Sequence, residues 1–282
     1  MRNNQDRLGA VAGGENPPIQ QSEQPEQPLQ FVTPTEFVDL PSKGRFYPPN
    51  HPLHNVEMIE IRHMTAKDED ILTSRSLLKK GIAIDRFLQN VVVDRTIKVE
   101  DLLIGDKNAV IIASRITGYG SGYDANIMCP SCNASVEFGF DLNQCKVTPF
   151  DKYKESDVHL TDDNTFIIHV DKADVDVEVR LMTSKDESFL LQLIERRRRK
   201  KLPESGLTDQ LRRFIVSVNG NSDPNYVESF IQHMPAIDSR KLRLTYQEVI
   251  PNVDMSHDFT CSDCGFEGEV NVPFGANFFW PK

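Results

Sequence analysis

Four cysteines in two Cys-x-x-Cys pairs are the residues of this chain best suited to chemistry. Cys129 and Cys132 lie in Met-Cys-Pro-Ser-Cys-Asn, and Cys261 and Cys264 lie in Thr-Cys-Ser-Asp-Cys-Gly. Each pair can place two thiolates on a tetrahedral zinc, and two pairs make a closed site without an open position for a substrate. The spacing therefore predicts one structural zinc per chain, held by all four cysteines.

Other roles for these thiols are less favoured. About 130 residues separate the pairs, more than in a compact zinc finger, so two separate thiol pairs or free buried cysteines stay open as alternatives. A thioredoxin-like redox site is disfavoured because neither pair begins a helix after a buried strand. Cys145 is expected to be a plain thiol. His257 could replace a ligand, but we expect it on the surface.

The other polar residues form no catalytic motif. The seven histidines include no His-Glu-x-x-His, no serine lies in Gly-x-Ser-x-Gly, and no Gly-x-Gly-x-x-Gly follows a strand. Ser42-Lys43-Gly44 lacks the remaining spacing of a phosphate loop; we expect a turn there, held by Phe46 and Tyr47. The chain is therefore not expected to be an enzyme.

An internal repeat relates the two cysteine pairs. Residues 59–72 and 177–190 are identical at eight of fourteen positions at an offset of 118, and the cysteines match at an offset of 132. A chance match is disfavoured because the order and spacing of the cysteines agree as well. Two units of this length suit neither a solenoid nor an array, so we expect two related lobes about a pseudo-twofold axis.

Each copy predicts the same succession of elements. Strands are expected at 58–63 and 175–181, followed by helices with Thr65 and Thr183 as N-caps and Asp68 and Asp186 at N3. Short helices then lead to each knuckle, which a β-hairpin carries. The fold class is therefore α+β, with two related, zinc-ribbon-like lobes joined by the shared four-cysteine site. The expected domains are a disordered tail at 1–30, a proline-rich extended arm at 31–57, a first lobe at 58–145, a linker with an extra strand at 146–174, and a second lobe with an aromatic C-terminal tail at 175–282.

Composition limits the cellular setting. Hydrophobic residues make up 39% of the chain, and Met1 to about Gln30 nearly lacks large apolar residues, so this tail is expected to be disordered. It has no apolar stretch of the kind found in signal peptides. No later run approaches the roughly 20 apolar residues of a membrane span. We expect a soluble chain made in a reducing cytoplasm.

The charge distribution disfavours a general nucleic-acid binder. The formal net charge is −10, whereas such proteins carry a basic face. The exception is the run Arg196–Lys201, which precedes Pro203 and is expected to be a helix C-terminus favoured by the helix dipole. An anionic partner, or a nucleic acid, is a less favoured interpretation of this run.

Two segments resemble a known family. Leu40-Pro-Ser-Lys-Gly-Arg-Phe-Tyr47, followed by Ile61-Arg-His-Met-Thr-Ala-Lys-Asp-Glu-Asp-Ile-Leu72 and a helix to Gly81, resembles the baseplate hub subunit family of T4-like contractile-tail bacteriophages. The likeness is best over Leu40–Val110. It implies a structural protein of the tail baseplate, present in the virion and, during assembly, in the host cytoplasm. Its implied partners are other baseplate and tail proteins and several copies of itself, without a membrane. No binding residue is carried over.

Two other functions remain open at this stage. A tail-assembly chaperone would bind the same partners but leave before the particle is complete. A zinc-ribbon regulator would bind nucleic acid through Arg196–Lys201 in a salt-dependent manner, which the net acidity of the chain disfavours.

Overall fold

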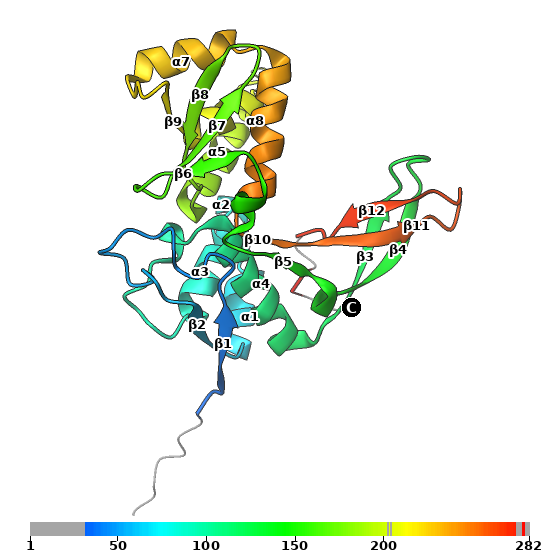
Figure 1. Cartoon of the computed structure of the whole chain (residues 1–282). Coiled ribbons are helices and arrows are strands. Elements are labelled where there is room, and N and C mark those ends of the chain that lie inside the picture. Colours follow the sequence, from blue (N-terminus) through cyan, green and yellow to red (C-terminus); the bar gives the residue numbers. More distant parts are fainter. Residues whose placement is uncertain (1–31, 202, 204, 275–277, 280–282) are drawn as a thin grey trace, which may run out of the picture. The chain divides into compact units, whose positions relative to one another are not determined.

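The structure, a computed structural model, describes residues 32–201, 203, 205–274 and 278–279. The tail expected at residues 1–30 and the aromatic residue Trp280 lie outside the described residues. The chain contains both helices and strands from β1 at Thr35 onward (Figure 1). The mixed α+β class predicted from the sequence is therefore confirmed.

The first half of the described chain begins with a two-stranded antiparallel sheet and ends in a β-ribbon. Between them lie four α-helices and one 3-10 turn. The elements are β1 (Thr35–Asp39), β2 (Met58–Arg62), α1 (Ala66–Thr73), α2 (Arg75–Lys80), α3 (Ala83–Val91), η1 (Val99–Asp101), α4 (Ile104–Tyr119), β3 (Gly122–Met128) and β4 (Ser135–Asp141). Strands β3 and β4 pair antiparallel and form the first ribbon, which carries Cys129 and Cys132 at its turn.

The second half is built around a four-stranded antiparallel sheet in the order β6-β7-β8-β9. It too ends in a β-ribbon, formed by β11 and β12, with Cys261 and Cys264 at its turn. The elements are η2 (Leu142–Gln144), β5 (Lys146–Thr148), η3 (Lys152–Glu155), β6 (Val158–Leu160), β7 (Phe166–Val170), β8 (Val175–Val179), α5 (Ser184–Arg199), α6 (Gly206–Phe214), β9 (Ile215–Val218), α7 (Pro224–His233), α8 (Ala236–Val249), β10 (Asn252–Asp254), β11 (Ser256–Thr260) and β12 (Glu267–Asn271).

Local signals place the helix starts. Capping boxes at Thr65 with Asp68 and at Thr183 with Asp186 begin α1 and α5, as predicted. The basic run ends α5, where the carbonyl end of the helix favours positive charge. Gly81 ends α2 in the left-handed conformation at φ 68°, which glycine adopts without a steric cost.

The prediction of a single helix from Thr65 to Gly81 was wrong. The chain instead forms α1 and α2 with a break at Ser74, whose φ of −61° and ψ of 107° are not helical. The Ser74 hydroxyl lies 3.1 Å from that of Ser76. Ser74 is the N-cap of α2, and its extended backbone ends α1.

Segment 31–57, expected as an extended arm, contains β1 and a series of turns that pack into the core. Leu40, Phe46, Tyr47 and Leu53 are buried. The turn expected at Lys43-Gly44 is present, with both residues at positive φ. The segment therefore contributes apolar surface to the fold.

One hydrophobic core runs through both halves. Phe46 of the first half packs on Phe166 of the second, with ring centroids 5.5 Å apart. A polar cluster also joins the halves: the ammonium group of the buried Lys107 lies 2.7 Å from the Asp85 carboxylate and 3.0 Å from that of Glu187. Burial alone would lower the pKa of Lys107, but these two carboxylates outweigh it and raise the pKa, so the lysine stays charged.

Candidate metal centre

The turns of the two ribbons present the four cysteines in the same way. In the first, the N–H of Cys129 donates to the Ala134 carbonyl at 2.9 Å, and the N–H of Asn133 donates to the Cys129 carbonyl at 2.9 Å. In the second, the N–H of Cys261 donates to the Phe266 carbonyl at 2.8 Å, and the N–H of Gly265 donates to the Cys261 carbonyl at 3.0 Å. Asn133 and Gly265 both have positive φ, a conformation that Asn and Gly tolerate best. Each turn thus closes tightly and brings its two sulfurs to the same side.

Aromatic packing between the ribbons brings the two turns together. Phe138 of the first ribbon meets Phe259 of the second edge-to-face, with centroids 5.5 Å apart. Phe138 also meets Phe140 at 4.8 Å, and the Phe140 ring lies 5.2 Å from the His257 ring. In Figure 1 the ribbons run side by side to their tips. These ring contacts between the two ribbons therefore fix where the cysteines lie.

The four cysteine sulfurs form one cluster. The Sγ atoms of Cys129 and Cys264 lie 3.7 Å apart, and those of Cys132 and Cys261 lie 3.8 Å apart. All four lie within 4.8 Å of one another. Four sulfurs at about 2.3 Å from a tetrahedral zinc lie about 3.8 Å from each other. The cross-ribbon distances match this geometry, whereas two separate thiol pairs would not require it.

The sulfur cluster suits a bound cation. Backbone N–H groups of Cys132 and Ser131 lower the pKa of Cys129 to about 7, which favours its thiolate. The N–H of Ala134 also favours a Cys132 thiolate, but the interaction with the three other cysteines raises the pKa of Cys132 to about 12. Four thiolates this close repel one another unless a metal ion lies between them. Soft sulfur donors suit zinc.

The two other candidate residues lie outside the cluster. His257 is buried, not on the surface as expected, and its Nε2 lies 3.0 Å from the Asp141 carbonyl oxygen of the first ribbon. Its Nδ1 lies 3.2 Å from the Met255 carbonyl, so the ring links the two ribbons. Cys145 is half-buried and is not among the clustered cysteines.

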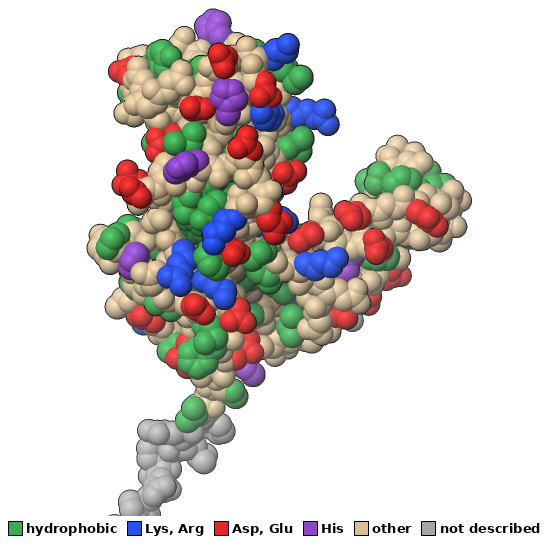
Figure 2. Space-filling model, in the orientation of Figure 1, with side chains coloured by type: hydrophobic (Ala, Val, Ile, Leu, Met, Phe, Trp, Pro, Cys, Tyr) green, Lys and Arg blue, Asp and Glu red, His purple; other side chains and the backbone are tan. Residues whose placement is uncertain are grey.

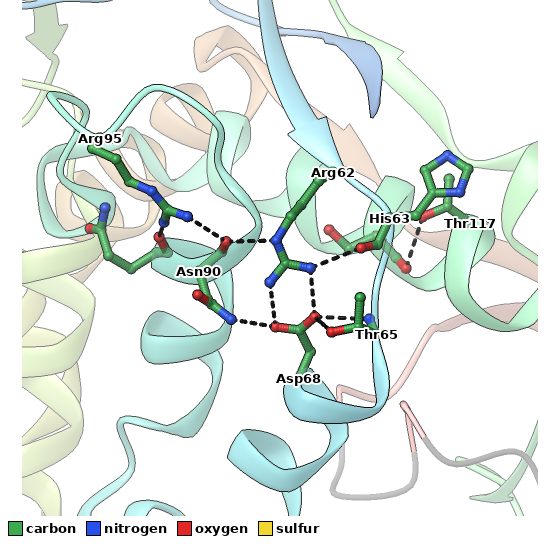
Figure 3. Close-up of polar contacts among 9 residues, drawn as sticks. Arg62, His63, Thr65, Asp68, Asn90, Arg95 and Thr117 are labelled. Carbon is green, nitrogen blue, oxygen red and sulfur yellow. Dashed lines mark hydrogen bonds and ion pairs between the residues drawn. The ribbon is translucent and has the colours of Figure 1, made fainter. Parts of the chain in front are cut away.

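A second polar cluster holds the start of α1 (Figure 3). The Arg62 guanidinium donates to both carboxylate oxygens of Asp68, at 2.7 and 2.8 Å. The Asn90 amide donates to Asp68 at 2.6 Å, and the N–H of Thr65 donates to it at 2.8 Å. Burial alone would raise the pKa of Asp68, but these hydrogen bonds outweigh it and lower the pKa to about 2. The carboxylate is fully saturated with donors, which suits a structural role.

Comparison with known proteins identifies the family. A family described as T4 bacteriophage base plate protein matches residues 33–280 of the chain. The chain belongs to this family. No significant match was found among curated proteins or solved structures.

Membership of this family settles the broad function. The chain is a structural protein of the phage baseplate, located in the tail, where it contacts other tail proteins, and not an enzyme. Within the part of the baseplate protein that the structure describes, no helix is long and apolar enough to cross a membrane.

The Arg62–Asp68 cluster makes the stability of this baseplate protein fall at low pH. The folded-state pKa of Asp68 is about 2, below its ordinary value of 3.8. Its contribution is therefore fully present above pH 3.8 and is lost as the pH falls towards 2. We expect Asp68→Asn to cost on the order of 1–2 kcal/mol at pH 7 and to flatten the loss of stability between pH 4 and 2. Urea unfolding at a series of pH values measures this; an unchanged slope in the variant would contradict it.

The buried carboxylate of Asp106 was not predicted from the sequence. Asp106 of α4 is fully buried and accepts hydrogen bonds from the Ser42 hydroxyl at 2.6 Å, the Ser42 N–H at 3.0 Å and the Tyr47 hydroxyl at 2.8 Å. These contacts hold the Pro-Ser-Lys-Gly turn on the first half of the baseplate protein. An aspartate in the first turn of an apolar helix was the available signal, but helix-dipole arguments explain such a residue without a partner.

Proposed function

We propose that this baseplate protein is a permanent component of the hub region of the contractile tail. Two likenesses carry this proposal. The family match spans residues 33–280. The segments Leu40–Tyr47 and Ile61–Leu72 resemble hub subunits in particular. The buried packing of the first segment supports its being a structural element of the subunit.

Quantitative mass spectrometry of purified mature tails tests the hub assignment. We expect a fixed stoichiometry relative to other baseplate proteins, and loss of the protein from tails stripped of their hub. Abundance in infected lysate combined with absence from finished tails would contradict a permanent role and would instead identify an assembly chaperone. Copurification with DNA or RNA in a salt-dependent manner would favour the regulator.

The proposal includes one structural zinc per chain, bound by Cys129, Cys132, Cys261 and Cys264. The supporting facts are the sulfur separations of 3.7 and 3.8 Å across the ribbons and a donor set that zinc prefers. Each ribbon supplies two ligands, so the metal would join the C-terminal ends of the two halves. A structural zinc can contribute on the order of 10 kcal/mol to the folded state.

An internal duplication is also part of the proposal, and three sets of matching contacts support it. The first is an ion pair after β2 and β8. Arg180 donates to both oxygens of Asp186 at 2.7 and 2.8 Å, the same distances as between Arg62 and Asp68. In both pairs the aspartate is the N3 residue of a helix with a capping box. The offset between the two pairs is 118 residues.

The second set is a carboxylate at the start of α4 and α8. Asp106 accepts from the N–H of Ser42 at 3.0 Å, and Asp238 accepts from the N–H of Lys172 at 3.1 Å. Ser42 follows β1 and Lys172 follows β7. The two aspartates differ by 132 positions, which is also the offset between the cysteine pairs.

The third set is a strand contact after α3 and α6. Val92 forms an antiparallel bridge with Ile61, and Ile215 pairs antiparallel with Val179. In each case the partner lies one residue before the arginine of the ion pair. These contacts support two lobes that begin earlier than at residues 58 and 175, at β1 and at β7. A common ancestor of the two halves explains why each ends in a cysteine turn.

A further inference from the structure

Strand β1 leaves one of its two edges open. The N–H of His63 donates to the Pro34 carbonyl at 2.9 Å, and the N–H of Leu40 donates to the Glu57 carbonyl at 2.8 Å. Even-numbered residues of this segment therefore bond to β2. Because bonding direction alternates along an antiparallel strand, the odd-numbered residues of β1 point their N–H and C=O groups away from β2. Among the described residues, no strand pairs with this outer edge.

The matching edge in the second half holds a strand. There β7 pairs with β8 on one side and with β6 on the other. The first bond on the β6 side runs from the N–H of Thr161 to the carbonyl of Thr165 at 2.8 Å. A third antiparallel strand therefore pairs with β7 in the second half. The matching strand of the first half, β1, has no such neighbour among the described residues.

Two side chains beside the open edge are apolar and exposed. Phe37, at the centre of β1, is 65% exposed, and the neighbouring Met58 of β2 is 48% exposed, whereas Val38 on the opposite face is buried. Figure 2 shows hydrophobic side chains gathered at the surface over β1. Edge strands are commonly protected by charged side chains, proline, a bulge or short length. β1 is short and carries Glu36 and Asp39, but it has no lysine, proline or bulge between Thr35 and Asp39. An open edge with an exposed aromatic residue marks an interaction surface.

The edge is complementary to itself. If two copies of β1 run antiparallel about Phe37, each Thr35 lies opposite the Asp39 of the other copy, and the two Phe37 rings lie opposite each other. All three pairs have their backbone groups facing the partner strand, which gives about six hydrogen bonds. Thr and Asp can also hydrogen-bond through their side chains, and aromatic pairs stabilise opposed strands. A twofold axis needs only one surface for both partners.

From this geometry we infer that β1 of one copy pairs antiparallel with β1 of a second copy, with the twofold axis at Phe37. The result is a continuous four-stranded sheet in the order β2-β1-β1-β2 that carries Phe37 and Met58 of both copies on one face. Each copy has a formal net charge of −10, so added salt weakens the repulsion between copies and strengthens the dimer.

Analytical ultracentrifugation of the full chain over a series of concentrations tests this dimer. We expect the natural chain to dimerise, and Phe37→Asp and Phe37→Lys each to weaken the dimer roughly tenfold or more, because like charges then lie directly opposite. An equimolar mixture of the two variants restores a dimer, because Asp then faces Lys. The control is Ile237→Asp, which changes a similarly exposed apolar side chain of α8 and leaves the dimer intact.

Three results would overturn the inference. The natural chain could stay monomeric at all concentrations, which would leave the edge to a strand of another tail protein. Both charge variants could dimerise as well as the natural chain, which would put the interface elsewhere. The mixture could stay monomeric although the natural chain dimerises, which would exclude the Phe37-centred register. Circular dichroism melting of each variant verifies that the fold is retained.

Discussion

Replacing Cys261 by serine is expected to remove zinc from the baseplate protein and to destabilise it strongly. Cys261 is buried and its sulfur lies 3.8 Å from that of Cys132 on the other ribbon. A serine hydroxyl is a poor zinc ligand, so the remaining thiolates lose a counter-charge that holds them together. We expect the free energy of unfolding to fall by about 3–5 kcal/mol, less than the full contribution of a zinc site because the aromatic contacts between the ribbons remain. Tm should fall by about 10 °C.

Cys145→Ser is the matched control for this experiment. Cys145 is half-buried and follows the first ribbon, but it lies outside the four-sulfur cluster. The control should keep one zinc per chain, measured by mass spectrometry of the metal, and its Tm should stay close to that of the natural chain. Two results would sink the shared site: unchanged zinc content in Cys261→Ser, or equal zinc loss in both variants.

Structure followed most directly from sequence where a residue pattern has one physical explanation. A Thr with an acidic residue three positions later, directly after a strand and before an apolar helical pattern, predicts a capped helix start, and both predicted boxes are present. Two Cys-x-x-Cys pairs predicted a common site, and the four sulfurs do lie together. The family resemblance, drawn from two short segments, was confirmed over most of the chain, although the hub subunit in particular was not.

The parts that failed depend on partners that are distant in the sequence. Ser42 is bonded by Asp106, 64 residues away, so nothing local indicated that the segment before residue 57 is packed. His257 looked like a surface residue because one of its two carbonyl partners, that of Asp141, lies 116 residues away on the other ribbon. Tertiary contacts decided both.

Arg115 shows how such a distant contact controls the C-terminal end of the baseplate protein. It is a fully buried arginine of α4. Its guanidinium donates to three backbone carbonyls, those of Phe278 at 2.7 Å, Gly120 at 2.6 Å and Gly122 at 2.9 Å. Phe278 and Phe279 are buried beside it, so at these two positions the aromatic tail packs on the core. One side chain therefore joins α4, the start of the first ribbon and the chain's last described residues.

Arg115→Ala is expected to destabilise the protein by about 3–5 kcal/mol. The substitution leaves three buried carbonyls without their donor, and each hydrogen bond to a charged group is worth roughly 1.5–3 kcal/mol. Arg95→Ala is the matched control, since Arg95 also donates to two backbone carbonyls, of Gln89 and Asn90, but is exposed; we expect a change within about 0.5 kcal/mol. Urea unfolding followed by tryptophan fluorescence and by circular dichroism measures both. Equal effects of the two substitutions would show that burial of the Arg115 contacts contributes nothing, whereas a large difference would establish that this arginine holds the C-terminal segment on the fold.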